Sequence, residues 1–278
     1  MSKKQMLLIA LALLLIPFSP FHKAKAAETV EIPIIMYHKV TKDSAQWGKF
    51  AIAPWELEAD FKFLKANGYQ AILIQDLIDF VTQGVALPQK PILLTFDDGL
   101  FSDFHYVYPL ALTEEIPVLL SIIGEETQRH SEDPQEGIIL PHITWSQVIE
   151  MANCAYVDIQ NHSYALHKTQ QGAQGAKKRS GEGIEAYHSR LEEDLKALQD
   201  AIKQHTGKTP STFTYPFGAK SEGSDNILQK IGFQASLMTE NRLAEVTQGD
   251  PDSLFSLNRL IRPHGKSLEQ ILNAQLGS

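Results

Sequence analysis

The stretch Leu93-Leu94-Thr95-Phe96-Asp97-Asp98-Gly99 runs from apolar residues directly into two adjacent carboxylates and a glycine. Together with Ile92, its first residues form the continuous apolar run that is typical of a parallel strand covered on both faces. Asp97 and Asp98 stand where this strand leaves the core, and Gly99 allows a sharp backbone turn there. Two neighbouring carboxylates push one pKa upward unless a cation or hydrogen-bond donors neutralise them. A metal ion held by one carboxylate, with the other left free as a base, meets that requirement; an ordinary turn is the alternative interpretation of Asp-Asp-Gly.

Apolar runs and helical patterns alternate along the rest of the chain. The apolar runs predict strands at 32–37, 71–74, 92–96, 117–123, 155–160, 212–215, 234–238 and 254–260. Helical spacing predicts helices at 55–64, 76–82, 102–114, 144–152, 184–204, 225–231 and 267–275. This alternation favours a single α/β domain built as a parallel barrel, with chemistry at the carboxyl ends of the strands and an open doubly wound sheet as the alternative. We expect surface excursions at 130–137 and 170–183.

The first 26 residues have the layout of a secretory signal peptide. Lys3 and Lys4 precede an apolar stretch at 6–17, and Ala24-Lys25-Ala26 offers a small-residue cleavage site. The apolar stretch is short for a membrane span, and retention as an uncleaved anchor is the alternative. We therefore expect a secreted or cell-envelope protein whose catalytic domain occupies residues 27–278.

Charge and cysteine content narrow the possible partners and ligands. Without residues 1–26 the chain keeps 21 basic and 33 acidic residues, a net charge of -12. That balance argues against nucleic acid and anionic polymers as partners. Because Cys154 is the single cysteine, no internal disulfide can form, and a metal site must use His with Asp or Glu. We expect a monomer.

His162 and His167 follow another predicted strand at 155–160. On a regular helix, side chains five positions apart point about 140° away from each other, so two ligands at this spacing require an irregular turn. Neutral imidazoles are preferred ligands of zinc and similar ions. Two histidines and one carboxylate leave coordination positions open for water and substrate, as catalytic metal sites require.

Three motifs in order resemble those of a known family. Thr95-Phe96-Asp97-Asp98-Gly99, His162-Ser163 with His167, and Tyr215-Pro216-Phe217-Gly218 are similar to successive motifs of the polysaccharide deacetylases, the family four carbohydrate esterases with a NodB homology domain. The resemblance covers nearly the whole chain after residue 26. It implies a distorted (β/α)7 barrel in a single domain.

The resemblance also implies roles for individual residues. Asp97 would be the general base. The metal ligands would be Asp98, His162 and His167. The backbone N–H of Phe217 would belong to the oxyanion site, with Tyr215 and Pro216 beside it at the substrate. The implied cofactor is a divalent metal, with Zn²⁺ first and Co²⁺, Ni²⁺ or Mn²⁺ as alternatives.

Three departures from the family pattern direct the assignment of the acid. The five-residue histidine spacing resembles the poly-N-acetylglucosamine deacetylases of biofilm systems, whereas most family members space the two histidines by four. Thr214 stands where most members have an arginine that orients the base, and a late His-Asp motif for the general acid is not evident. The segment from Pro33 to His38 resembles the opening motif that supplies this acid in the biofilm branch. We therefore assign His38 as the general acid, with His264 as the competing candidate.

These residues together predict metal-assisted removal of N-acetyl groups from an amino-sugar polysaccharide, with release of acetate. Candidate substrates are poly-N-acetylglucosamine, peptidoglycan strands and chitin-like oligomers. Trp47, Trp145 and Tyr164 are candidates for stacking on sugar rings, although each also suits a packing role. The alternatives are an O-acetyl polysaccharide esterase and a carbohydrate-binding protein that has lost catalysis, the latter suggested by Thr214.

Overall fold

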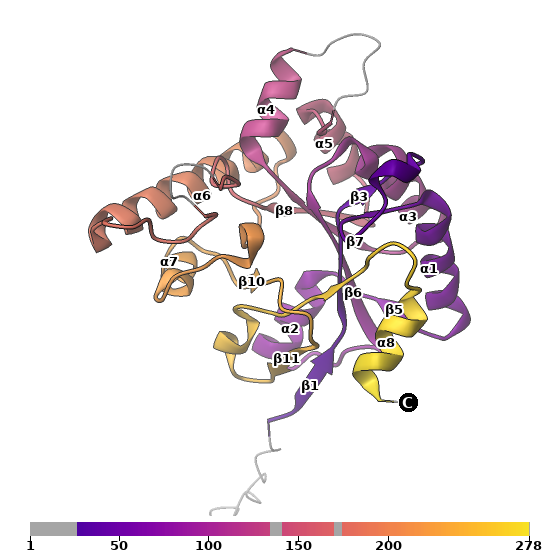
Figure 1. The fold of residues 1–278 in the computed structure, drawn as a ribbon. Coiled ribbons are helices and arrows are strands. Elements are labelled where there is room, and N and C mark those ends of the chain that lie inside the picture. Colours follow the sequence, from indigo (N-terminus) through magenta and orange to yellow (C-terminus); the bar gives the residue numbers. More distant parts are fainter. Residues whose placement is uncertain (1–26, 134–140, 170–173, 278) are drawn as a thin grey trace, which may run out of the picture.

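The computed structural model describes residues 27–133, 141–169 and 174–277, and its central element is a curled parallel sheet (Figure 1). Neighbouring strands follow the order β10–β9–β8–β7–β6–β2–β12, and all these pairs are parallel. Their bounds are β2 Ile34–Tyr37, β6 Pro91–Asp98, β7 Val118–Ile122, β8 Val157–Asn161, β9 Thr212–Thr214, β10 Ala235–Leu237 and β12 Leu260–Ile261. The predicted α/β barrel is confirmed as a half-barrel of seven parallel strands.

The two ends of this sheet are joined by a single residue. Leu257, just before β12, forms a parallel bridge with Leu237 of β10. Its N–H donates to the carbonyl of Ser236, and its carbonyl accepts from Met238, both at 2.8 Å. The sheet therefore curls back on itself, and the open doubly wound alternative is wrong.

Helices such as α1 and α5 cover the outer side of the sheet, whereas α2 packs against the opposite face (Figure 1). Their bounds are α1 Pro54–Ala66, α2 Ile74–Gln83, α3 Tyr108–Glu114, α4 Gly124–Glu132, α5 Trp145–Ala152, α6 Ile184–Thr206, α7 Ser224–Lys230 and α8 Leu268–Leu276. Helix α6 shows why the pattern predicted them, because its apolar stripe is fully buried at Leu191, Leu195, Leu198 and Ile202. Helix α5 begins where predicted, since the Thr144 side chain caps it.

Strand β6 is covered on both faces, as the apolar run predicted. Leu94 and Phe96 belong to an apolar cluster shared with α1 and α5, whereas Leu93 belongs to a second cluster shared with α2. Successive strand residues point to opposite faces, so the two clusters lie on opposite sides of the sheet. The strand that carries Asp97 and Asp98 is thus held from both sides.

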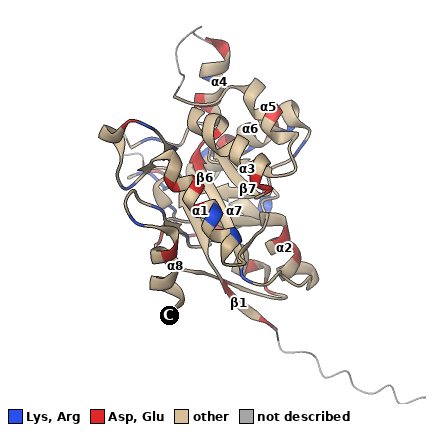
Figure 2. Cartoon of the chain, turned by 90° about the vertical axis from the view of Figure 1, so that its right-hand side faces the viewer, with Lys and Arg blue, Asp and Glu red and all other residues tan. Residues whose placement is uncertain are grey.

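Short elements complete the described chain. The remaining strands are β1 Thr29–Ile32 paired with β11 Ala244–Thr247, β3 Lys39–Val40 paired with β4 Ala51–Ile52, and β5 Gln70–Ala71 paired with β6. The single turns are η1 Ser44–Gln46, η2 Asp103–Val107, η3 Pro216–Gly218 and η4 Pro251–Leu254. Within the described ranges no helix is long and apolar enough to span a membrane. Acidic positions are spread over outer helices such as α2, α4 and α5 (Figure 2).

Four expectations about local structure need correction. The predicted strand 71–74 ends at Ala71, because the Asp76 side chain accepts from the N–H of Leu73 and α2 starts at Ile74. The predicted strand 254–260 shortens to β12 after η4. The predicted helix 102–114 divides into the π-helical η2 and α3. Helix α4 includes His130, where an excursion was expected, because its polar sequence lacks an apolar period. Residues 1–26, 134–140 and 170–173 of the predicted leader and excursions lie outside the described residues.

We predict that Asp158→Asn stabilises the protein at neutral and alkaline pH. Burial in β8 raises the pKa of Asp158 to about 6 from an ordinary value of 3.8. Because the folded state binds the proton more tightly than the unfolded chain, the stability that Asp158 contributes is complete below about pH 4 and is lost as pH rises through 6. The gain for the amide should reach roughly 3 kcal/mol above pH 7, from about 1.4 kcal/mol per pKa unit.

Thermal unfolding at pH 4.5 and pH 8 measures this difference. The exposed Asp200→Asn on α6 provides the matched control. An equal shift in Tm for Asp158→Asn at both pH values would contradict the assignment.

Candidate metal centre and active site

The carboxyl ends of neighbouring strands meet at one edge of the barrel, as parallel strands require. His38 follows β2, Asp97 and Asp98 end β6, His162 follows β8, and Phe217 lies in η3 after β9. A pocket of about 980 Å³ opens at this edge. The sequence-based candidates that line it are His38, Asp97, Asp98, His162, His167 and Phe217.

Asp98, His162 and His167 converge on one point. The Oδ1 atom of Asp98 lies 3.4 Å from Nε2 of His162 and 3.3 Å from Nε2 of His167. Ligand atoms of the three residues all lie within 4.8 Å of one another. The structure thus brings together the carboxylate and the two imidazoles that the sequence separates by more than 60 positions.

The two histidines are held by an irregular turn, as their spacing predicted. Nδ1 of His162 donates to the carbonyl of Thr214 at 2.8 Å, which fixes the ring with Nε2 toward Asp98. Ser163 has a φ of 73°, which turns the chain sharply after His162. The carboxylate of Asp194 on α6 then accepts backbone N–H groups from Tyr164 and Ala165 at 2.8 and 2.9 Å.

The donor atoms fit a divalent cation. Oδ1 of Asp98 is buried and has no hydrogen-bond partner among the described residues. Burial raises the pKa of Asp98, but the three histidines around it outweigh burial and hold the pKa well below its usual value. Burial and the neighbouring His162 lower the pKa of His167 to about 4, which keeps its imidazole neutral. An ionised carboxylate beside neutral imidazole is the donor set that zinc and similar ions prefer.

Asp97 is turned away from this cluster and is paired with Arg259. Nη1 and Nη2 of the arginine donate to the two carboxylate oxygens, each at 2.7 Å. Both side chains are buried, with exposures of 0 % for Arg259 and 2 % for Asp97. Burial raises the pKa of Asp97, yet the guanidinium outweighs it and holds the pKa below its usual value. Asp97 is therefore ionised and oriented without being a member of the metal cluster.

Arg259 supplies the positive charge that the sequence seemed to lack. Its Nε donates to the carbonyl of Met238 at 2.7 Å, and Nη1 also reaches Oγ1 of Thr95 at 3.0 Å. Thr214 does not contact Asp97; its hydroxyl pairs with Ser121 at 2.7 Å. The sequence feature that could have revealed this partner of Asp97 was the single arginine in the apolar run 254–260. A charged side chain inside a buried segment requires a partner.

Strained backbone concentrates at this edge of the barrel. Asp98, Ser163 and Phe217 have φ values of 77°, 73° and 59°, a region that non-glycine residues rarely adopt. Gly99 follows with a φ of 64°, and a Cβ there would lie 3.1 Å from the side chain of Ile122. Asp-Asp-Gly therefore forms a turn, which was its alternative interpretation. This turn directs Asp97 toward Arg259 and Asp98 toward the two histidines.

The structure separates the two candidates for the general acid. Nε2 of His38 lies 3.9 Å from Oδ2 of Asp97 inside the pocket. His264 instead stacks on Trp47 and places Nδ1 2.7 Å from Oε2 of Glu56. Burial lowers the pKa of His38, although Asp97 opposes that shift. Proximity therefore favours His38, whose ring is neutral in the resting pocket.

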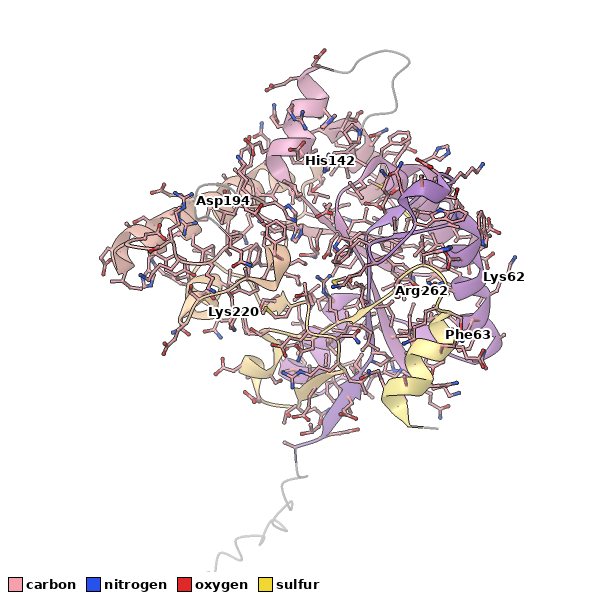
Figure 3. The ribbon with its side chains drawn as sticks, viewed as in Figure 1. Lys62, Phe63, His142, Asp194, Lys220 and Arg262 are labelled. Carbon is pink, nitrogen blue, oxygen red and sulfur yellow. The ribbon has the colours of Figure 1, made fainter. Side chains whose placement is uncertain are left out.

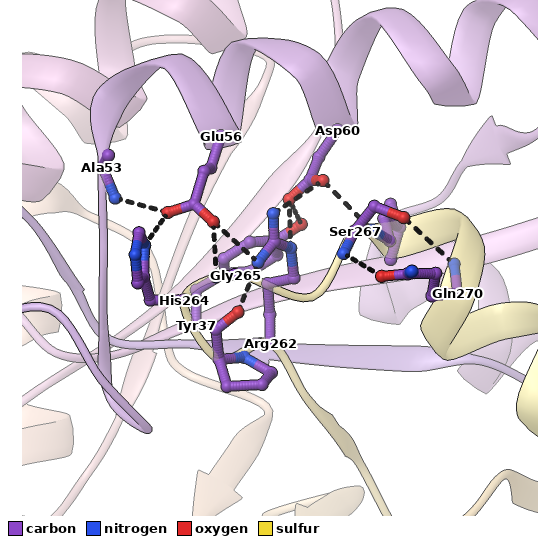
Figure 4. A network of polar contacts seen from close by, with 11 residues as sticks. Tyr37, Ala53, Glu56, Asp60, Arg262, His264, Gly265, Ser267 and Gln270 are labelled. Carbon is purple, nitrogen blue, oxygen red and sulfur yellow. Dashed lines mark hydrogen bonds and ion pairs between the residues drawn. The ribbon is translucent and has the colours of Figure 1, made fainter.

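A network outside the pocket accounts for His264 (Figure 4). Arg262 donates from Nε and Nη2 to the carboxylate of Asp60 at 2.7 and 3.1 Å. The Tyr37 hydroxyl donates to the same carboxylate at 3.1 Å, and Arg262 lies 3.6 Å from Glu56. This network fixes α1 against the segment that follows β12, and His264 is part of that attachment.

The third motif contributes one residue to the pocket wall. Phe217 is 42 % exposed and its ring lies 4.3 Å from that of His167. Tyr215 and Pro216, expected at the substrate, are buried behind it, and the Tyr215 hydroxyl lies 2.7 Å from Oδ1 of Asp225. Because the Tyr215 and Pro216 side chains are buried, Phe217 is the one residue of the three that lines the pocket. A Cβ on Gly218 would come within 2.1 Å of Oγ1 of Thr239, so glycine is required there.

The aromatic candidates for sugar stacking serve mainly in packing. Trp145 is buried and stacks on His205. Tyr164 packs against Gly124. Trp47 contacts Trp55 edge to face at 5.0 Å. These rings do not line the described pocket, whereas Phe217 does.

Comparisons with known proteins agree with this fold. The profile of the polysaccharide deacetylase family matches residues 84–236, and the chain belongs to that family. It is 24% identical over 254 residues to the poly-beta-1,6-N-acetyl-D-glucosamine N-deacetylase of Escherichia coli K12. That match covers 85% of this chain and 37% of the relative, so the chain spans little more than a third of the curated relative's length.

Solved structures show the same fold. A de-N-acetylase from Aggregatibacter actinomycetemcomitans superposes with a TM-score of 0.73 at 24% identity, covering 88% of this chain and 99% of that chain. IcaB from Ammonifex degensii superposes with a TM-score of 0.68 at 25% identity, covering 84% and 92%. The (β/α)7 architecture of these deacetylases is that of the present chain.

We predict that Arg259→Met destabilises the fold by about 3–5 kcal/mol, because it leaves the Asp97 carboxylate buried and unpaired. Adding Asp97→Asn should restore part of that loss, since the buried charge disappears. Denaturant unfolding of the two single variants and the double variant measures this coupling. Additive losses in the double variant would show that the two side chains do not act as a pair.

Proposed function

We propose that this protein removes N-acetyl groups from an N-acetylglucosamine polymer and releases acetate. The observation that carries the proposal is the placement of an ionised, metal-free carboxylate, Asp97, beside a second carboxylate that faces two imidazoles in one pocket. Family membership supports hydrolysis of an acetyl group on a polysaccharide. The N-acetylglucosamine polymer is suggested by the name of the Escherichia coli relative and by the five-residue histidine spacing.

Each pocket residue has a role in this proposal. Asp98, His162 and His167 would hold a divalent cation, with Zn²⁺ the first choice for this donor set. Such an ion would polarise the acetamide carbonyl and lower the pKa of water. The backbone N–H of Phe217 would stabilise the developing oxyanion, a contribution of roughly 3 to 4 kcal/mol for a well-placed donor.

Proton transfer is assigned to Asp97 and His38. Asp97 takes a proton from the attacking water, and Arg259 keeps the carboxylate ionised until then. Because His38 is neutral at rest and its Nε2 lies 3.9 Å from Asp97, the proton can pass from the carboxylate to the imidazole. His38 then protonates the leaving amine, and acetate and the free amine result.

Arg259 also argues against the alternative that the protein binds carbohydrate without catalysis. That alternative rested on Thr214 in place of an arginine, and the bidentate contact of Arg259 with Asp97 provides the same positive charge from the segment just before β12. We further propose that the protein acts outside the cytoplasm, in the cell envelope or secreted, from the sequence of residues 1–26.

We predict acetate release from N-acetylglucosamine oligomers that exceeds release from acetylated xylan. Asp97→Asn should abolish this activity and keep its metal content, because Asp97 is not a ligand. His162→Ala should lose the metal. Acetate assays with elemental analysis of each variant test these assignments.

Three outcomes would contradict the proposal. Release from xylan alone indicates an O-acetyl esterase. Oligosaccharide binding without acetate release by the metal-loaded protein indicates a binding protein. Retained activity of Asp97→Asn refutes its role as the base.

We predict that His38→Ala slows amide hydrolysis by about 10²–10⁴-fold, the usual contribution of a general acid. Hydrolysis of an aryl acetate should change little, because a phenolate leaves without a proton. Turnover of both substrates by His38→Ala and by the control His264→Ala measures the difference. Equal losses on amide and ester would assign His38 a merely structural role, and a selective loss in His264→Ala would reassign the acid.

A further inference from the structure

A second cluster of side chains that could bind a metal lies apart from Asp98, His162 and His167. Glu126 and His130 are one turn apart on α4, and His142 comes from the segment that precedes α5. Oε2 of Glu126 lies 3.6 Å from Nδ1 of His142. Ligand atoms of the three residues lie within 4.8 Å of one another, as do those of Asp98, His162 and His167.

The cluster is built into the fold. His142 forms an antiparallel bridge with Leu100, the residue after Gly99. The N–H of Ile143 donates to the carbonyl of Gly99, and the N–H of Phe101 donates to the carbonyl of Pro141, both at 3.0 Å. Figure 3 shows His142 close to α4. The segment that carries His142 is thus fixed to the turn that follows the catalytic carboxylates.

One buried ring nitrogen of the cluster has no protein partner. Nδ1 of His142 is buried and has no hydrogen-bond partner among the described residues. Nδ1 of His130 donates to the carbonyl of Glu126 at 2.7 Å, so the lone pair of that ring is on Nε2. Buried polar atoms normally have partners, and a bound cation would supply one for Nδ1 of His142.

We propose that Glu126, His130 and His142 form a second divalent-cation site, separate from the catalytic one. One carboxylate and two imidazoles are the donors that Zn²⁺ and Co²⁺ accept. The imidazoles are mostly buried, with side-chain exposures of 7% and 17%. An ion bound there would tie α4 to the turn at 99–101 through His142.

A small pocket gives both clusters access to solvent. Its volume is about 140 Å³, and its lining includes Glu126 and His142 together with the catalytic ligands Asp98 and His167. The second ion would therefore be bound across a narrow space from the first. Because the two clusters share this pocket, the number of bound ions, rather than activity, directly measures whether the second site is occupied.

Arg129 competes for the carboxylate. Its guanidinium pairs with Oε2 of Glu126, but the arginine side chain is 63% exposed and can turn into solvent. Binding of a cation requires that displacement, so the second site should be weaker than the catalytic one. Arg129→Ala should then tighten it by up to about fivefold, the upper range for losing an exposed ion pair.

The test counts Zn²⁺ bound by untagged, chelator-stripped full-length protein, by equilibrium dialysis and elemental analysis. The wild type should bind two equivalents. The variant His162→Ala with His167→Ala should keep one, and its Tm should rise with added Zn²⁺. His142→Ala in the wild-type background should bind one equivalent, and Co²⁺ spectra should report the loss of one set of absorption bands.

Glu125→Gln is the matched control, because Glu125 lines the same small pocket but is not a member of the cluster. It should bind two equivalents. The proposal is overturned if the wild type binds a single equivalent, or if His142→Ala and wild type bind the same number. It is also overturned if Arg129→Ala weakens binding.

Discussion

The ion pair between Asp97 and Arg259 is the contact on which the rest of the site depends. A carboxylate at the buried end of β6 is costly without a counter-charge, and a guanidinium that contacts both oxygens also fixes its rotation. Once Asp97 is held this way, it cannot join Asp98 around a cation. The two adjacent carboxylates therefore serve separate purposes, although they share a strand and a pocket.

Strained backbone accompanies the separation of Asp97 and Asp98 into two roles. The left-handed residues at Asp98, Ser163 and Phe217 end three different strands of the same barrel edge. Each turns a functional group inward, and the regular hydrogen bonds of the strands behind them supply the stability that the turns lack. The packing of β6 between two apolar clusters explains how a pair of acidic residues can be kept at the end of a buried strand.

The sequence was most informative where a pattern is local. The buried stripe of α6, the Thr144 cap and the polar residues at strand ends follow from local spacing, and the family resemblance added His38 and Phe217. The barrel and six of the residues that line the pocket could therefore be predicted. Arg259 could not, because it lies 162 positions from Asp97 and nothing local marks its partner. Helix α4 was missed for a related reason, since its polar residues are stabilised by tertiary contacts. The substrate contacts expected of Tyr215 and Pro216 failed because a motif does not reveal which of its residues point inward.

The bridge at Leu257 has a consequence for the order in which the molecule is completed. The residues that close the barrel, neutralise Asp97 and attach α1 are Leu257, Arg259 and Arg262, and all three belong to the last tenth of the chain. During synthesis, β6 through β10 leave the ribosome before any of them. Until that final segment arrives, the sheet has an open seam and two buried acids without their arginines. The segment 257–262 thus completes the surroundings of Asp97 only after β1 through β11 have been made.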